Sequence, residues 1–133
     1  MRKLLIASLA LLPMLAAGAT CPVLPDDAGL AWKASQQENG MTCYALESDG
    51  SIAFGFWLGT TRVEMPSESD DLGSGQIAGI PVRWVKAKGH TSRQALVMLG
   101  GGTQVHAFVP DSPRDTLQLR LDQLAALSVP GAP

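Results

Sequence analysis

The chain has 133 residues, of which 46% are hydrophobic, and a formal net charge of −2. This length suits one small domain with its own core. The mild acidity leaves no electrostatic footprint for nucleic acid, and the sequence lacks the basic amphipathic helix that would suit a membrane surface. Composition therefore favours a single globular domain whose partners are neither nucleic acids nor membranes.

The segment 1–19 has the organisation of a secretory signal peptide. Arg2 and Lys3 precede an apolar run, which ends in small residues up to Ala17-Gly18-Ala19. A charged start, a short apolar middle and an A-x-A ending are typical of such a signal, and the run is shorter than the about 20 residues that span a bilayer. We expect cleavage before Thr20, and the loss of two cations takes the net charge from −2 to about −4.

Cys21 and Cys43 are the only cysteines, and both lie in the predicted mature domain, 20–133. An exported chain is predicted to be periplasmic or secreted, where a structural disulfide is expected. It would close a loop of about 23 residues, worth about 3 kcal/mol on the chain-entropy model. A lipid anchor on Cys21 is the less favoured alternative, because Gly18 and Thr20 fit the lipidation motif poorly. A reactive thiol is not favoured, because the sequence has no Cys-x-x-Cys pair and no activating histidine beside either cysteine.

The first half of the mature chain predicts a meander of strands joined by tight turns. The turn signals are ENG at 38–40 and SDG at 48–50, because Gly and Asn accept positive φ. The runs between them are rich in strand formers. The strand candidates are 30–36, 41–47 and 51–59, with 60–65 continuing or restarting the third.

The segment 66–76, PSESDDLGSGQ, interrupts this pattern. It is rich in Pro, Ser, Asp and Gly and can bury little apolar surface, so we predict an exposed, mobile loop. Neither half of the chain is long enough to fold alone. The loop therefore separates two halves of one domain.

The second half predicts further strands and a closing helix. Pro81 sits near the start of its strand, where a missing N–H does least harm, and 92–99 is apolar on both faces, as in a central strand. The segments are strands at 77–88, 92–99 and 104–110, with a glycine turn at 100–103.

The helix has Asp111 or Ser112 as its predicted cap and Pro113 at its first position. Its leucines follow helical spacing and are expected to pack on the sheet before Pro130 ends the helix. The stripe consists of Leu117, Leu121, Leu124 and Leu127. The fold class is therefore predicted to be α+β, an antiparallel sheet of about six strands with one C-terminal helix packed on one face.

Three pieces carry a resemblance to a known group: GIPVRWVKAKG, RQALVMLGGGTQVHAFV and DTLQLRLDQLAAL. Their order over 79–127 of strand, turn, strand, glycine hairpin, strand and leucine-rich helix resembles the C-terminal half of PsbP-like α+β domains, found in many exported bacterial proteins. The resemblance covers roughly half of the mature chain. It implies an antiparallel sheet with a helix on one face and a binding or scaffolding role; it assigns no functional residue.

Motifs for catalysis or metal binding are missing from the sequence. His90 and His106 are sixteen residues apart with no ligand cluster beside either. The glycines at 100–102 lead into a strand, whereas a phosphate cradle needs a helix N-terminus, and no Gly-x-Ser-x-Gly elbow is present. The acids of 64–71 lack EF-hand spacing. We expect neither an enzyme nor a bound metal or cofactor.

Two features favour binding. The acids at 64–71 precede cations at 83–93, and the two groups could attract each other or serve separate partners. Most aromatic residues are expected in the core, but one of two tryptophans near the loop could be an exposed anchor. The binding candidates are Glu68, Asp70, Asp71, Trp57 and Trp84.

These observations predict a non-catalytic, exported binding protein. Its most concrete form is an envelope inhibitor or immunity-type protein whose acidic loop enters the basic cleft of a hydrolase. The alternative is a binding module for a small apolar or lipid ligand, held between sheet and helix. The oligomeric state stays open.

Overall fold

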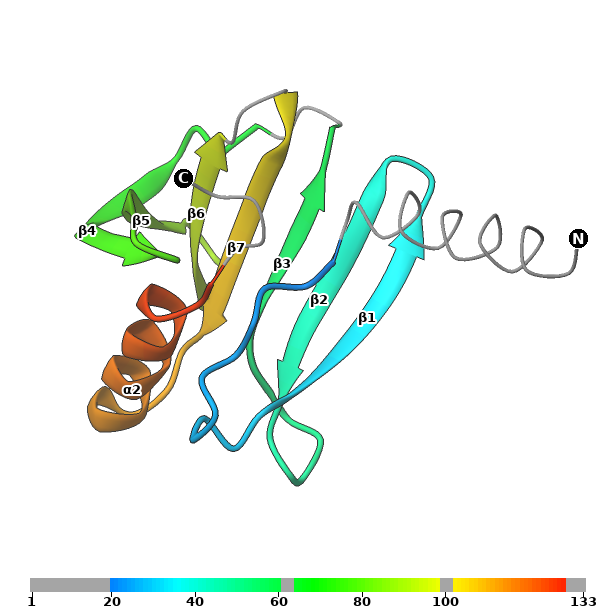
Figure 1. Ribbon diagram of the computed structural model, residues 1–133. Helices are drawn as coiled ribbons and strands as arrows, with labels where there is room; N and C mark the ends of the chain where they lie inside the picture. Colours follow the sequence, from blue (N-terminus) through cyan, green and yellow to red (C-terminus); the bar gives the residue numbers. More distant parts are fainter. Residues whose placement is uncertain (1–19, 61–63, 99–101, 129–133) are drawn as a thin grey trace, which may run out of the picture.

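Alternating apolar residues build most of this domain into one sheet. In the computed structural model, which describes residues 20–60, 64–98 and 102–128, seven segments form strands and one forms a helix (Figure 1). The elements are β1 (Ala31–Gln37), β2 (Gly40–Leu46), β3 (Ile52–Gly59), β4 (Ser69–Ile77), β5 (Ile80–Ala87), β6 (Ser92–Met98), β7 (Gln104–Pro110) and α2 (Arg114–Ala125). The predicted signal peptide, 1–19, lies outside the described residues, as do 61–63, 99–101 and Pro130.

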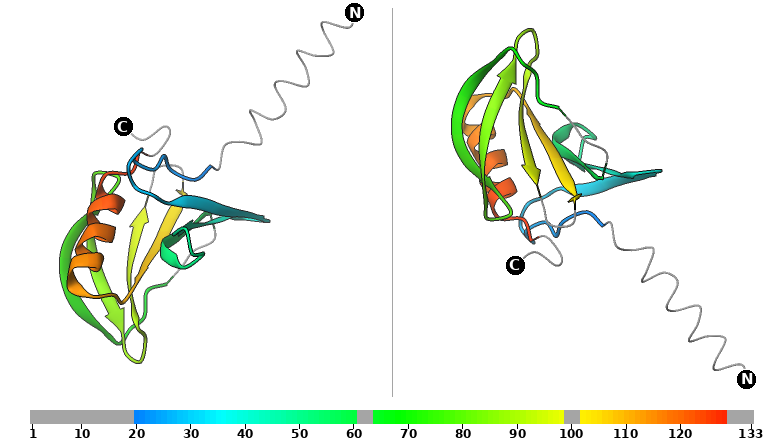
Figure 2. Two further views of the ribbon diagram at one scale, coloured as in Figure 1. Left: turned by 90° about the horizontal axis from the view of Figure 1, so that it is seen from below. Right: turned by 90° about the horizontal axis from the view of Figure 1, so that it is seen from above.

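The strands form one antiparallel sheet with the order β1-β2-β3-β7-β6-β5-β4. Two meanders, β1 to β3 and β4 to β7, meet where β3 pairs with β7. The helix α2 contacts β4 and β7, and the sheet curls around it (Figure 2). The predicted α+β fold with a helix on one face is confirmed, with seven strands in the described residues where about six were expected.

The additional strand is β4, which occupies the segment predicted to be a loop. Within the described sheet β4 is an outer strand that pairs with β5 alone, and most of its side chains are exposed. An outer strand is held by backbone pairing along one side, so Ser, Asp and Gly suffice where apolar alternation is missing. The loop prediction for 66–76 was therefore wrong over Ser69–Gln76, although the predicted exposure is confirmed.

The predicted strand at 77–88 also divides differently. Ile77 ends β4, and a turn at Ala78 and Gly79 leads into β5. Both turn residues have positive φ, 51° and 77°, as in the primed turns that match the twist of hairpins. Alanine is unusual there, so the sequence carried no signal for this turn.

The turn at 38–39 forms where it was predicted, but for another reason. Gly40 does not adopt a positive φ. A Cβ at this position would lie 2.1 Å from the backbone oxygen of Leu58 on β3. Glycine is therefore required by close approach of two strands. The predicted continuation of β3 does not appear at Thr60, Glu64 or Met65.

The hydrophobic core lies between the sheet and α2. On β7 the residues Val105, Ala107 and Val109 are buried, as their alternation predicts. Leu124 of α2 and Leu127 just beyond it are buried, and Leu117 and Leu121 pack against the cluster, so the leucine stripe faces the core as predicted. The helix itself ends at Ala125, earlier than the predicted end at Pro130. The strand residues buried in this cluster are Met41, Cys43, Ala45, Ala53, Phe54, Phe56, Leu58, Ile77, Val82, Trp84, Ala95, Val97, Val105, Ala107 and Val109.

The start of α2 differs from the prediction. Pro113 is the residue before the first helical one, and no side chain among the described residues caps the helix. Asp111 is hydrogen-bonded to Lys86 at 2.6 Å, and Ser112 Oγ donates to the Pro110 carbonyl at 3.3 Å. Both predicted caps therefore have other partners.

The N-terminal arm, residues 20–30, is fastened to the sheet. The disulfide between Cys21 and Cys43 joins it to β2, which confirms the predicted pairing. Trp32 Nε1 donates to the Pro22 carbonyl at 2.7 Å, and Val23 bridges Ser128 beyond α2. In the described part of the chain, we find no helix with the length and hydropathy needed to cross a membrane.

Candidate functional site

The predicted acidic segment lies at the outer edge of the sheet, beside cations of β5 and the turn after it. Asp71 Oδ2 accepts a hydrogen bond from Arg83 at 2.5 Å, and Glu68 lies 3.8 Å from Lys88 Nζ. The bond from Arg83 and a second from the Gly73 amide lower the pKa of the Asp71 carboxyl. Of the two predicted arrangements, attraction between the acidic and basic segments is the one observed. Asp70 is exposed on the same strand.

The two candidate tryptophans lie on opposite faces of the sheet. Trp84 is 3% exposed and belongs to the core under α2, so it presents no ring to a partner. Its ring packs over Gly75, where a Cβ would lie 2.6 Å from Nε1. Trp57 points to the face without a helix and is half-buried.

That second face carries an apolar and aromatic cluster, which we name the open-face cluster. Strand register places Trp57 and Leu96 on either side of His106, and Gly55 between Tyr44 and Phe108. The cluster consists of Tyr44, Trp57, Leu96, His106 and Phe108, with Met98 beside it. Its members are half-buried, and Met98 is 61% exposed.

Glycine allows the rings of this cluster to meet. The rings of Tyr44 and Phe108 form an edge-to-face pair with centroids 5.9 Å apart. A Cβ on Gly55 would lie 2.7 Å from atoms of both rings. Strand register places this ring pair on the same face as the neighbouring row of Trp57, His106 and Leu96. Sequence reasoning missed this surface because it assigned most aromatic residues to the core.

His106 contributes a neutral polar group to the open face. Its Nε2 lies 3.0 Å from Oε1 of Gln94, so the neutral ring donates its proton to an amide oxygen. Burial lowers the pKa of His106 below its ordinary value of 6.5. An amide cannot relay a proton as a carboxylate does, so this pair does not form a catalytic dyad.

His90 lies in the exposed turn between β5 and β6, away from the cluster residues in the strand register. Over residues 20–60, 64–98 and 102–128, no three His, Cys, Asp or Glu side chains gather where a metal ion could be held. We therefore assign no metal ligand among the described residues.

An apolar cleft opens on the helix side of the sheet. It has a volume of about 290 Å³ including its open mouth, and no polar atom contributes to its surface. The N-terminal arm, the turn between β4 and β5, and strands β3, β6 and β7 form its walls. The lining residues are Pro22, Phe56, Leu58, Ile77, Ala78, Ile80, Val97 and Val105.

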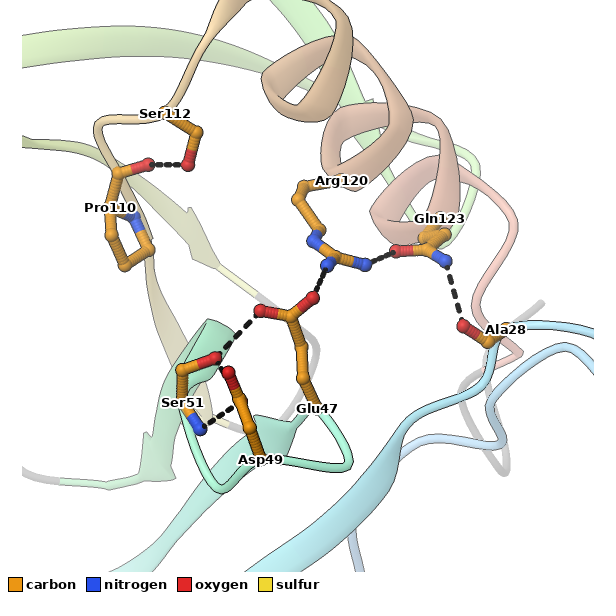
Figure 3. A network of polar contacts seen from close by, with 8 residues as sticks. All are labelled: Ala28, Glu47, Asp49, Ser51, Pro110, Ser112, Arg120 and Gln123. Atoms are coloured by element: carbon orange, nitrogen blue, oxygen red, sulfur yellow. Dashed lines mark hydrogen bonds and ion pairs between the residues drawn. The ribbon is translucent and has the colours of Figure 1, made fainter.

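A polar network connects α2 to two segments of the first half (Figure 3). Arg120 donates to Glu47 before the turn at 48–50 and, at 3.1 Å, to Gln123. Gln123 in turn donates to the Ala28 carbonyl of the arm at 3.2 Å. Arg120 looks like an exposed helix position in the sequence, and no local signal indicates that it is buried.

The comparisons with known proteins found no match: no family model fits the chain, and neither a curated protein nor a solved structure resembles it. The resemblance of 79–127 to PsbP-like domains therefore stays a prediction.

Proposed function

We propose that the mature chain is a non-catalytic, exported protein that binds another protein of the cell envelope through the open-face cluster. The observation that carries the proposal is this aromatic surface on the sheet face opposite α2. Tyrosine and tryptophan are enriched among the residues that dominate binding energy. Contiguous exposed apolar patches on small domains mark sites of interaction.

The charges of this face favour an apolar, uncharged partner surface. Burial lowers the pKa of His106, so its ring is neutral at pH 7 and binding desolvates no charge there. An envelope inhibitor or immunity-type protein remains the most concrete form of the proposal. The acidic segment has a secondary role in it, because a basic partner would compete with Arg83 and Lys88 for the carboxylates of Asp71 and Glu68.

The test uses Met98→Glu, which places a charge at the rim of the cluster on an already exposed side chain. Leu119→Glu is the matched control, since Leu119 is 50% exposed on α2 and the charge change is the same. Proteins retained from envelope fractions by residues 20–133 are purified, and their affinities are measured by calorimetry. We expect Met98→Glu to weaken binding about tenfold or more, equivalent to about 1.4 kcal/mol, and Leu119→Glu to bind like the wild type. Equal affinities for the two variants would contradict the open face as the binding surface.

A second candidate function is the binding of a small apolar ligand. The apolar cleft supports it, because it lies between the sheet, the arm and the turn between β4 and β5, and its surface is wholly apolar. Native mass spectrometry of the freshly purified chain would then show an adduct. Val97→Phe, which fills the cleft, should abolish the adduct, and Met98→Phe, on the opposite face, should retain it. A wild-type chain without any adduct would contradict this candidate.

A further inference from the structure

The two outer strands of the sheet differ in how they are protected against pairing with another chain. β4 has a bulge between Asp71 and Gly73, where the register shifts and Leu72 is the extra residue. It carries two aspartates, and Gly73 has a φ of 99°. Bulges and charges are the usual means by which proteins block the edge of a sheet. The β4 edge is therefore protected against pairing with a strand of another chain.

β1 lacks both the bulge and the aspartates, and one lysine is the only charge that protects it. Its seven residues pair with β2 in continuous register, without a bulge. The strand contains no Gly or Pro, and Lys33 is its one charged residue. Among the described strands β2 is its one neighbour, and β1 lies at the end of the sheet away from α2 (Figure 2). Along the outer side of such a strand, alternate residues direct their N–H and C=O groups outward.

This edge is also held rigidly in place. The ring of Trp32 packs against Phe54 and Phe56, with centroids 6.0 and 5.6 Å away, and its indole donates to Pro22. Ala34 pairs with Cys43, which the disulfide ties to the arm. A strand that is already ordered loses little conformational entropy when a partner adds to it.

We propose that the β1 edge, from Ala31 to Ser35, receives an extended segment of the partner protein as an additional antiparallel or parallel strand. The backbone groups of the edge provide affinity for an extended chain, which is the one conformation that matches their spacing. Lys33 favours a carboxylate on the segment at the position beside it. Lys33 pairs with Tyr44 of the open-face cluster, so an added strand would extend the same face. The inference rests on the proposed protein-binding function and names how the partner docks.

The test selects peptides of about ten residues from a random display library against residues 20–133. Two kinds of variant probe the edge. Lys33→Glu reverses its charge, and Arg114→Glu is the control with the same charge change, since Arg114 is exposed at the start of α2, away from β1. Ala34→Pro and Ser35→Pro each remove one N–H, and because neighbouring N–H groups alternate, one of these points outward. The proline variant that keeps the wild-type urea midpoint is the one used for binding.

Selected peptides should contain alternating strand formers and a carboxylate. Their Kd should rise about tenfold or more with Lys33→Glu and with the folded proline variant, and should stay unchanged with Arg114→Glu. Amide exchange of residues 31–35 should slow in the complex. Peptides that bind all variants equally, an absence of enriched peptides, or a β1 edge protected by self-association of the chain would each overturn the inference. If only Met98→Glu raised the Kd of the selected peptides, the open-face proposal would hold and the edge would be rejected. If none of the variants changed the Kd, both proposals would be rejected.

Discussion

Arg120 of α2 forms an ion pair with Glu47, 73 residues earlier in the chain, and this contact connects the helix to the first meander. The Arg120 side chain is 8% exposed and that of Glu47 is 41% exposed. The guanidinium is therefore the buried partner, and it depends on Glu47 and Gln123 for its hydrogen bonds.

We predict that Glu47→Ala destabilises the domain more than Arg120→Met does. The first change leaves a buried guanidinium with one amide partner, while the second replaces it by an apolar chain of similar length. Glu47→Ala is expected to cost about 1–3 kcal/mol, and the measurement is the free energy of unfolding in urea. Asp49→Ala is a control in the same turn, since Asp49 does not contact the helix (Figure 3). A larger loss for Arg120→Met would contradict this account.

Removal of the disulfide should loosen the arm and lower stability. The Cys21→Ala, Cys43→Ala double variant is expected to lose about 3 kcal/mol of unfolding free energy, because the unfolded chain gains the freedom of the opened loop. Urea unfolding without reductant measures the difference. Reductant should destabilise the wild type and leave the double variant unchanged; equal urea midpoints for both proteins without reductant would show that the bond contributes little.

Stability should depend on the protonation of His106. Its folded pKa lies below 6.5, so the unfolded chain binds the proton more readily, and stability rises with pH where the two states differ. The contribution of the neutral ring is complete above pH 6.5 and is lost as the pH falls through the folded pKa. His106→Gln should remove this pH dependence, and His90→Gln should retain it. Urea midpoints between about pH 5 and 7.5 measure the effect, and a His90→Gln profile that flattened instead would contradict the assignment.

Two glycine substitutions should differ in cost. Gly55→Ala is expected to cost about 1–3 kcal/mol, because its Cβ would push apart the rings of Tyr44 and Phe108, which can shift. Gly40→Ala should cost more, since its Cβ would meet the backbone of Leu58, which is held by the β2–β3 ladder. Thermal unfolding compares the two variants. A smaller loss at Gly40 would show that the hairpin adapts more easily than the ring cluster.

Local pattern was sufficient for much of the fold. Strand alternation at Val105, Ala107 and Val109, helical spacing at Leu117, Leu121 and Leu124, and the two cysteines all predicted what the structure contains. The strand and helix signals each lie within a short segment, and the disulfide joins the only two cysteines of the sequence. Such signals need no knowledge of which segments meet.

The candidate site depended on information that the sequence does not carry locally. Trp57 and Trp84 are equivalent as residues, and the pairing of β3 with β7 and of β5 with β4 put one on the open face and the other under α2. Arg120 is buried where α2 meets the first meander, and there Glu47 accepts its hydrogen bond.

By itself, the sequence determined the α+β class, the positions of most strands, the C-terminal helix and the disulfide, because periodic apolar residues and cysteine chemistry act over short stretches. Only the tertiary structure decided that Ser69–Ile77 is a strand and that the aromatic residues of β2, β3 and β7 share an uncovered face. Both outcomes result from backbone pairing between segments that are distant in the sequence. Backbone N–H and C=O groups form these hydrogen bonds whatever the side chains are, so the residue types do not reveal which segments pair.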